Sequence, residues 1–257
     1  YTIDISAFEP ELAAEINKSF IQELDLHQNE YNSAITSETR QFIEDRIMTT
    51  EKELNELDDV LPKLKIPVHV GYRLRWNPTV IKLRERINRV KKISCMYNLE
   101  MKKLDANKGW TRKYKMSGGS FFTLGVHALD LARWLAGARG EPLVDFSAFT
   151  GSIEDTCDFP LHVQLSGILP SGIRIIAGAD LRCGTPYSFN IEIEADKGSY
   201  PDSILHPPVI DDEDTEFEGL IGHFISAAEQ RVWDGDEHKE VIQTHRELLE
   251  ARRNTNS

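Results

Sequence analysis

Residues 118–130 read Gly118-Gly119-Ser120-Phe121-Phe122-Thr123-Leu124-Gly125-Val126-His127-Ala128-Leu129-Asp130, a glycine pair followed by a nearly all-apolar stretch. The apolar residues after the pair predict a helix from about Ser120 to Gly137, since they recur at i, i+3 and i+7 spacing. A glycine after the last apolar turn is typical of a helix end. His127 is one of few polar groups on this helix, so its imidazole needs either a buried partner or a substrate.

A second stripe of the same helix, roughly 100° around from the apolar one, is formed by Thr123, His127, Asp130 and Trp134. Two interpretations of His127 are open. As a functional group, it would exchange protons near neutral pH, because an imidazole has an unperturbed pKa of about 6.5. As a core residue, it would be held by Asp130 or by a backbone carbonyl. No HxxxH or HExxH motif accompanies it, so no metal site is predicted.

The composition is that of an ordinary globular protein and argues against several classes. Hydrophobic residues make up 40% of the 257 residues and charged residues 28%. The formal charge of −12 argues against binding to a nucleic acid backbone, for which a basic stripe is expected. No apolar run of about 18 residues predicts a membrane span, and no basic leader is visible. The three widely spaced cysteines fit free thiols in a reducing compartment, so we expect a cytoplasmic protein.

After about residue 90 the apolar residues alternate with polar ones, a period typical of half-buried strands. The alternation covers residues 93–99, 161–169, 173–181 and 189–194. Pro170-Ser171-Gly172 predicts a hairpin turn between two of these strands. Strands joined by short turns imply a broad, mostly antiparallel sheet with one face covered by helices. Residues 219–232 and 238–253 are expected to be helical.

The N-terminal portion has mixed strand and helix character. Residues 1–8 alternate like a strand, and helices are predicted over residues 11–20 and 49–64. The residues between those helices show no sustained period. The sequence therefore predicts a small α/β domain over residues 1–68 and an α+β domain over residues 69–257. This layout suggests a cofactor domain joined to a substrate domain.

Three segments resemble, in the same order, motifs of the glucose-fructose oxidoreductase / inositol dehydrogenase / MocA (Gfo/Idh/MocA) family. Residues 118–130 resemble its GGGxxxDxGxHxxD signature. Gly71-Tyr72-Arg73-Leu74-Arg75-Trp76-Asn77-Pro78 resembles the segment that opens its second domain, and Gly109-Trp110-Thr111-Arg112 resembles the Trp-Arg stretch before the glycine pair. The resemblance covers roughly residues 48–257 and favours a functional His127.

The resemblance implies an NAD(P)-dependent oxidoreductase that transfers a hydride between NAD or NADP and a hydroxyl or keto carbon of a sugar, nucleotide-sugar or cyclitol. Its fold would be an incomplete Rossmann-like N-terminal domain followed by the α+β substrate and oligomerisation domain. His127 would act as the acid/base, because removal of a hydride from an alcohol requires loss of the hydroxyl proton. We expect a homodimer or homotetramer formed through the sheet face.

The resemblance also gives roles to other residues. The substrate side would be lined by Tyr72, Arg73, Asn77, Trp110, Arg112 and Asp130. Trp110 and Arg112 would also lie near the cofactor, where an arginine can stack or fork onto an anionic group. A rim aromatic and a solvated charge are the alternative interpretations of these two residues. Arg73 and Arg75 alternate on a segment expected to be extended, so only one should face the cleft.

Thr123 departs from the family pattern, which usually has an aspartate four residues before the histidine. A threonine cannot take a proton or stabilise an imidazolium by charge, so a paired Asp–His relay is absent. As an i, i+4 neighbour of His127, Thr123 stays a candidate catalytic position. The similarity from Trp110 to Trp134 makes a nucleotide-sugar or a hexuronate the preferred substrate.

The N-terminal portion departs further. No GxGxxG motif occurs, and no Glu-Lys-Pro precedes the helix at Thr49, where the family places its catalytic lysine. Tyr1 would begin at the second strand of a Rossmann fold, which leaves out the first strand and its phosphate-binding turn. Glu9 would then match the acidic residue that accepts the ribose hydroxyls, with Asp4 as a rival. Either the chain has lost dinucleotide binding, or stretches of the cofactor domain lie outside this sequence; the broken period favours the second explanation.

Two other functions are weighed against this one. A catalytically inactive sugar-binding or assembly protein of the same fold would keep only the substrate domain. A glycoside hydrolase would need two carboxylates, and Asp130 and Glu154 are available. Nothing in the sequence brings those two carboxylates together, so this function is the most distant.

Overall fold

The structure is a computed structural model. It describes residues 10–60, 70–100, 109–138, 140–151, 158–182, 184, 187–196, 198–205, 210–230 and 235–255. By its contacts the chain divides into two units, Tyr1–Thr50 and Glu51–Ser257. The expected strand over residues 1–8, and with it Glu9, lies outside the described residues. Among the described residues, no helix has the length and apolar character that crossing a membrane requires.

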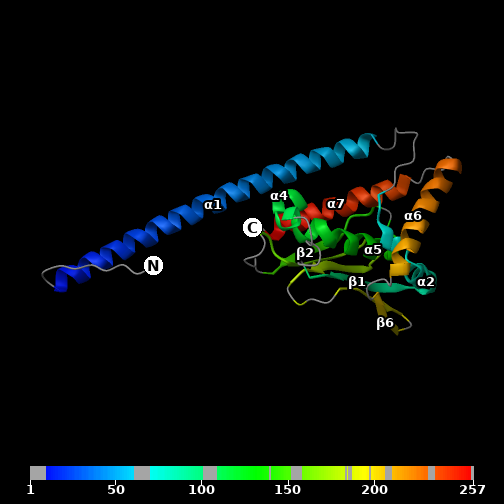
Figure 1. Cartoon of the computed structure of the whole chain (residues 1–257). Helices are drawn as coiled ribbons and strands as arrows, with labels where there is room; N and C mark the ends of the chain where they lie inside the picture. The colour runs from blue at the N-terminus through cyan, green and yellow to red at the C-terminus, as the bar shows by residue number, and fades with distance from the viewer. Residues whose placement is uncertain are drawn as a thin grey trace. The chain divides into compact units, whose positions relative to one another are not determined.

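A single helix, α1 (Pro10–Val60), spans the described part of the first unit and continues into the second. Figure 1 shows it as an uninterrupted ribbon. No glycine and no second proline occurs between Glu11 and Val60, and the helix-favouring Glu and Leu are frequent. Pro10 stands at the helix start, where its missing N–H costs nothing.

This helix corrects the expectation of two helices, over residues 11–20 and 49–64, separated by an irregular stretch. Without helix-breaking residues the helix continues through the middle stretch. The broken apolar period there means that the helix has no continuous apolar stripe, and it does not mean that the helix is interrupted. Residues 10–60 contain no strand. The described part of residues 1–68 therefore differs from the βαβ pattern that a partial Rossmann-like domain has.

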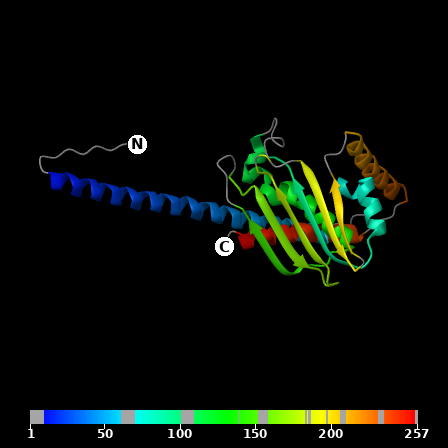
Figure 2. The same cartoon turned by 90° about the horizontal axis from the view of Figure 1, so that it is seen from below.

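The second unit is built on a six-stranded sheet with the order β2-β3-β4-β1-β5-β6. Its strands are β1 (Val90–Asn98), β2 (Val144–Thr150), β3 (His162–Ile168), β4 (Arg174–Asp180), β5 (Ser188–Ala195) and β6 (Gly198–Leu205). Only the β1–β4 pair is parallel among these neighbours. Figure 2 shows the strands side by side. The predicted broad, mostly antiparallel sheet is confirmed, as is the hairpin that joins β3 and β4.

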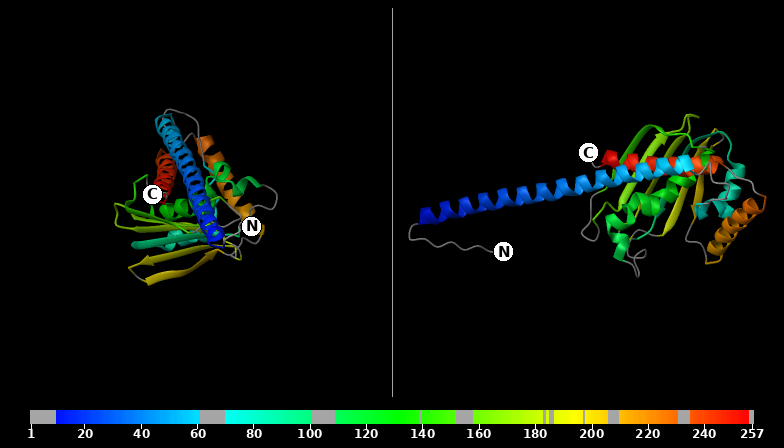
Figure 3. Two further views of the ribbon diagram at one scale, coloured as in Figure 1. Left: turned by 90° about the vertical axis from the view of Figure 1, so that its left-hand side faces the viewer. Right: turned by 90° about the horizontal axis from the view of Figure 1, so that it is seen from above.

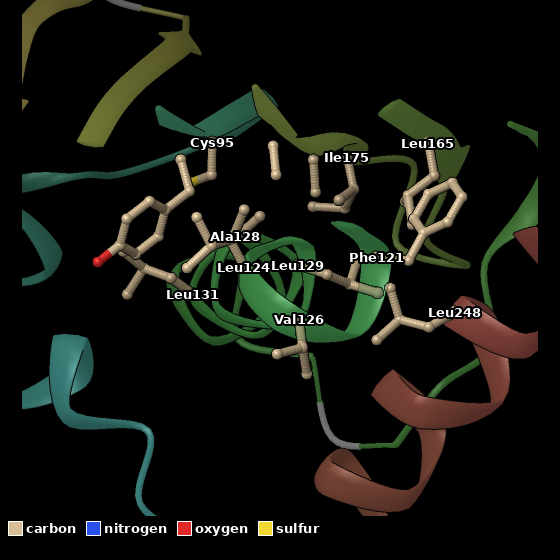
Figure 4. Packing of buried hydrophobic residues seen from close by; sticks show 14 of the residues in the cluster. Cys95, Phe121, Leu124, Val126, Ala128, Leu129, Leu131, Leu165, Ile175 and Leu248 are labelled. Atoms are coloured by element: carbon tan, nitrogen blue, oxygen red, sulfur yellow. The ribbon is translucent and has the colours of Figure 1, made fainter. Parts of the chain in front are cut away.

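Alternate residues of the central strands face the core. On β1 these are Ile93, Cys95 and Tyr97, and Cys95 is paired in register with Ala177 of β4. Figure 4 shows Cys95 and Ile175 above the helix α5 (Val126–Ala136). α5 contacts both β1 and β4, so its apolar face closes the middle of the sheet.

The predicted helix around His127 has two parts. Residues Phe121–Gly125 form a π-helical turn, and α5 then runs from Val126 to Ala136. It ends at Gly137, which adopts a left-handed backbone with φ of 73°, as the helix-end glycine was predicted to do. A π-helical turn widens the backbone, and Gly125 allows this because a Cβ there would lie only 3.2 Å from the Ser120 carbonyl oxygen.

A buried arginine joins α5 to α7 (Gly235–Thr255). The Arg133 side chain is fully buried, and its guanidinium donates to Glu240 Oε1 at 2.5 Å and to Glu247 Oε1 at 2.6 Å. It also donates to the Glu141 carbonyl oxygen at 2.8 Å. Burial opposes the charge, but the two carboxylates offset this and raise the pKa of Arg133. This network fixes α7 and the connection after α5 together.

The last turns of α1 belong to the second unit and lie against α7. Arg253 donates to Glu51 at 2.6 Å, and Arg246 donates to Asn55 at 2.8 Å. Leu54, between these two contacts, is buried. Figure 3 shows this end of α1 alongside α7. These contacts give the C-terminal turns of α1, where the sequence predicted a helix from about residue 49, a tertiary partner in α7.

A comparison of Gly118 with Gly172 separates the cost of backbone strain from the cost of steric overlap when a side chain is added. Both Gly118 (φ 76°) and Gly172 (φ 86°) are left-handed, but an added Cβ would lie 2.8 Å from Phe122 Cβ at Gly118 and within 4 Å of nothing at Gly172. We expect G172A to lower the free energy of unfolding by about 1 kcal/mol, from strain alone. G118A should lower it by about 3 kcal/mol, because overpacking adds to the strain. Urea unfolding of both variants measures the difference, and equal losses would contradict it.

Candidate active site

Two tyrosine rings from separate elements lie beside the His127 imidazole. Tyr72 precedes the short 3₁₀ helix η2 (Arg73–Trp76), Tyr97 lies on β1, and His127 lies in the first turn of α5. The Tyr72 ring lies edge-on to the imidazole with centroids 6.0 Å apart, and the Tyr97 ring lies 6.1 Å from it. The imidazole is therefore flanked by two phenol rings directly after the π-helical turn.

Tyr97 extends this cluster towards β5. Its hydroxyl lies 3.3 Å from the Tyr187 hydroxyl, and its ring meets the Phe189 ring edge-on at 5.2 Å. Burial raises the pKa of Tyr97, so the phenol is protonated at neutral pH. The Arg73 guanidinium acts on the same phenol and opposes the rise of its pKa. Sequence reasoning missed Tyr97, although the alternation of β1 places it on the same face as Ile93 and Cys95.

Tyr72 contributes a buried phenol. Its side chain is only 5% exposed, and its hydroxyl has no hydrogen-bond partner within the described part of the chain. Burial is the main cause that raises the pKa of Tyr72. A protonated hydroxyl that lacks a protein partner is available to a ligand beside His127.

Arg73 brings positive charge to this cluster. Its guanidinium lies over the ring of Phe217, 5.6 Å from the centroid, on α6 (Ile210–Gln230). Burial and then the charge of Arg73 lower the pKa of His127 to about 4. The imidazole is therefore neutral at neutral pH, with one nitrogen that donates and one that accepts.

Asp130 is paired with Arg75. Arg75 Nε donates to Asp130 Oδ2 at 2.8 Å, and a second bond joins Arg75 Nη2 to Asp130 Oδ1. Both side chains are nearly fully buried, and Arg75 also lies over the Tyr72 ring. The substrate contact predicted for Asp130 stays a prediction, and its carboxylate would share its oxygens with this pair. The pair also shows why Arg73 and Arg75 differ: in a 3₁₀ helix, not an extended segment, one reaches the aromatic cluster and the other reaches Asp130.

Asn77 and Thr123 are both engaged with backbone. The Asn77 side-chain oxygen accepts from the backbone N–H groups of Thr79 and Val80, so it caps α2 (Pro78–Arg86). The Thr123 hydroxyl donates to the Gly119 carbonyl oxygen at 2.8 Å. A substrate role for Asn77 and a catalytic role for Thr123 stay predictions. In either role, the side-chain oxygen would also have to serve the backbone hydrogen bond that it already makes.

The remaining predicted residues are only partly described. Arg112 is half-buried in the short 3₁₀ helix η3 (Gly109–Arg112), but the side chain of Trp110 lies outside the described residues. Glu9 and Glu154 lie outside them as well. Trp134, from the predicted second stripe, lies beneath the Arg84 guanidinium at 3.8 Å. Within the described residues, no group of three or more His, Cys, Asp or Glu could hold a metal ion.

A family comparison matches the core of the second unit. Residues 84–201 match the model of the GFO/IDH/MocA C-terminal domain. This range contains β1, the π-helical turn, α5 and the strands up to β5. No curated protein sequence is significantly similar to the chain.

Several solved structures share the fold at low sequence identity. Myo-inositol 2-dehydrogenase from Lactobacillus plantarum is 15% identical, with a TM-score of 0.60, over 80% of this chain and 68% of that one. Levoglucosan dehydrogenase in complex with NADH and levoglucosan is 14% identical, with a TM-score of 0.60, over 79% and 69%. GenD2 from gentamicin A biosynthesis in complex with NAD is 16% identical, with a TM-score of 0.58, over 74% and 61%. The chain therefore spans less than two thirds of the GenD2 chain.

The low pKa of His127 can be measured directly. In an NMR titration of the full chain, with the His127 signal assigned by its loss in H127Q, we expect a pKa of about 4. R73Q should raise this pKa only partway towards 6.5, because burial is the larger cause and remains.

The same shift predicts a pH dependence of stability. The folded-state pKa of His127 lies below the unfolded value, so the unfolded state binds the proton more readily. His127 should lower the free energy of unfolding as the pH falls from about 6.5 to about 4, and have no effect above this window. H127Q should lose this slope, and a wild-type His127 pKa near 6.5 would contradict both expectations.

Proposed function

We propose that the second unit is the substrate half of an NAD(P)-dependent oxidoreductase, since residues 84–201 match the model of the GFO/IDH/MocA C-terminal domain. The reaction would transfer a hydride between a nicotinamide and a hydroxyl or keto carbon of a sugar, nucleotide-sugar or cyclitol. The observation that carries the proposal is the neutral His127 imidazole between the Tyr72 and Tyr97 rings.

The chemistry of a hydroxyl group suits this cluster. Oxidation of a secondary alcohol releases a proton from the hydroxyl, and the accepting nitrogen of a neutral imidazole can take it. The protonated Tyr72 phenol, which lacks a protein partner in the described structure, can donate to a substrate oxygen. The ring faces of Tyr97 and Tyr72 can pack against the C–H groups of a sugar or cyclitol ring.

The described residues do not fit a nicotinamide dinucleotide. The sequence has no GxGxxG turn to cradle the pyrophosphate, and residues 10–60 are one helix without a strand. Hydride transfer therefore requires a dinucleotide site beyond the described residues. Contacts of Glu9, Trp110 and Arg112 with NAD or NADP stay part of the proposal, supported by the NAD-bound and NADH-bound structures that share the fold.

A second candidate function is a catalytically inactive sugar-binding or assembly protein. Two observations favour it: α1 occupies the region expected to carry cofactor-binding strands, and Thr123 stands where the family usually has an aspartate. Both candidates share the substrate site, and they differ in dinucleotide binding and turnover.

Titration of the full chain with NADH and NADPH, followed by nicotinamide fluorescence, separates the two candidates. The oxidoreductase predicts binding of one dinucleotide and oxidation of a sugar or cyclitol when the oxidised form is supplied. In that assay H127Q should lower kcat by about 100-fold or more, the usual contribution of an acid/base group.

H162Q is the matched control, because His162 lies on the half-exposed side of β3. It should keep wild-type turnover. Sugar binding without any dinucleotide binding or turnover would instead support the inactive protein. Equal turnover in H127Q and wild type would remove His127 from the mechanism.

We also propose that the chain forms a homodimer or homotetramer through the uncovered face of the sheet. Phe149 of β2 is 58% exposed on this face, opposite Gln164 of β3. Analytical ultracentrifugation of the full chain should show a dimer or tetramer, and F149E should shift it towards monomer. M116E is the control, because Met116 is equally exposed but lies on α4 (Tyr114–Ser117). A monomeric wild type would refute the proposal.

A further inference from the structure

We propose that α6 and α2 form a self-complementary surface through which two copies of this chain associate, with α6 of each copy against α2 of the other. This surface is separate from the uncovered face of the sheet. It concerns the assembly of the chain and goes beyond the proposed oxidoreductase reaction.

α6 is packed against the domain on one side. Gly219 and His223 face η2: a Cβ added to Gly219 would lie 3.1 Å from Trp76 Cβ, and the His223 ring lies 4.6 Å from the Trp76 ring. Leu220 lies beside Gly71 on the same side of the helix. These contacts fix which side of α6 is turned away from the domain.

The side turned away carries an exposed apolar stripe. Its members recur at i, i+4, i+7 and i+8 and therefore share one face of the helix: Phe217, Ile221, Phe224 and Ile225. Ile221 is 54% exposed and Ile225 is 49% exposed. The Phe217 ring contacts Arg73, yet 47% of Phe217 remains exposed. A contiguous apolar stripe with two aromatic rings is typical of an interaction surface.

Acidic residues border this stripe. Glu218 and Glu229 lie next to it by the rotation of about 100° per residue, and both are exposed. Residues 211–218 contain six acidic residues and no basic one. Helices that lie on lipid carry basic residues on their polar face, and an anionic membrane would repel this one. The stripe therefore fits a protein surface with a basic border.

This chain has such a basic surface beside α6. η2 contacts both α6 and α2, and Figure 1 shows the two helices at the same end of the sheet. Residues 82–92, which cover the end of α2 and the start of β1, contain six basic residues and one acidic residue. Lys82 and Arg86 are exposed on α2. The acidic border of one copy can therefore meet the basic border of another.

Two-fold symmetry would make this contact twice. In an isologous interface both copies use the same patch, so α6 of each copy meets α2 of the other. Four half-exposed side chains cannot supply the roughly 800 Å² per partner that a stable interface buries, so a second element has to contribute. α2 is the neighbour that adds area of the opposite charge. Combined with association through the sheet face, this second interface would give a tetramer.

Analytical ultracentrifugation of the full chain over a range of concentrations tests the surface. I221E should halve the mass of the assembly, because a carboxylate at the centre of an apolar contact loses its hydration. F149E/I221E should be monomeric. M116E is the matched control, since Met116 is exposed on α4, and it should keep the wild-type mass. Circular dichroism of I221E should match wild type, because Ile221 contributes little to the core.

An exchange of charges tests the pairing of α6 with α2. E218K and K82E should each weaken association by about 5-fold, since each places like charges across the interface. The double variant E218K/K82E should recover most of the wild-type affinity, because it restores opposite charges in reversed order. K113E is the control, since Lys113 is exposed just before α4, and it should leave the affinity unchanged.

The results separate this surface from other occupants of the stripe. A monomeric wild type, or an I221E variant with the wild-type mass, overturns the proposal. An unchanged mass with weaker NADH binding in I221E would assign the stripe to the dinucleotide site, and binding of wild type but not I221E to phosphatidylcholine vesicles would assign it to lipid. A halved mass without recovery in E218K/K82E overturns the role of α2. Turnover by H127Q tests the oxidoreductase separately from all of these.

Discussion

α5 is covered on both sides, and the charges on its outer side must therefore be paired. The sheet covers one side through Ala128 and Leu131, and η2 and α7 cover the other. Asp130 and Arg133 lie on that second side with exposed fractions of 1% and 0%. An unpaired charge at such a position would destabilise the fold by several kcal/mol, about 3–5. Asp130 instead pairs with Arg75 of η2, and Arg133 pairs with Glu240 and Glu247 of α7.

The site depends on one of these two pairs. Asp130 holds Arg75, and Arg75 fixes the 3₁₀ turn that begins one residue after Tyr72. Tyr72 and Arg73 are thereby placed beside His127, which lies almost one turn before Asp130 on the same helix. The Asp130–Arg75 pair thus supports the segment that carries Tyr72 and Arg73.

The sequence predicted the features that have a regular period. The alternation of apolar residues predicted β1, β3, β4 and β5 and the hairpin at Gly172, and the apolar stripe predicted the helix that ends at Gly137. The strands β2 and β6 were not predicted. It could not predict which arginine Asp130 binds, because that depends on how η2 turns. Tyr97 was missed because one aromatic residue in a strand looks like core until its neighbours are known. α1 was misjudged because its apolar period is weak, and helix propensity, not burial, specifies most of its length.

Burial sets the acid–base character of the aromatic cluster. It is the larger cause that lowers the pKa of His127 to about 4, and the charge of Arg73 adds to it. Burial also raises the pKa of Tyr72 and of Tyr97, so all three rings are uncharged at neutral pH. Removal of the Arg73 charge alone would therefore leave the imidazole a weak base, because its burial would remain.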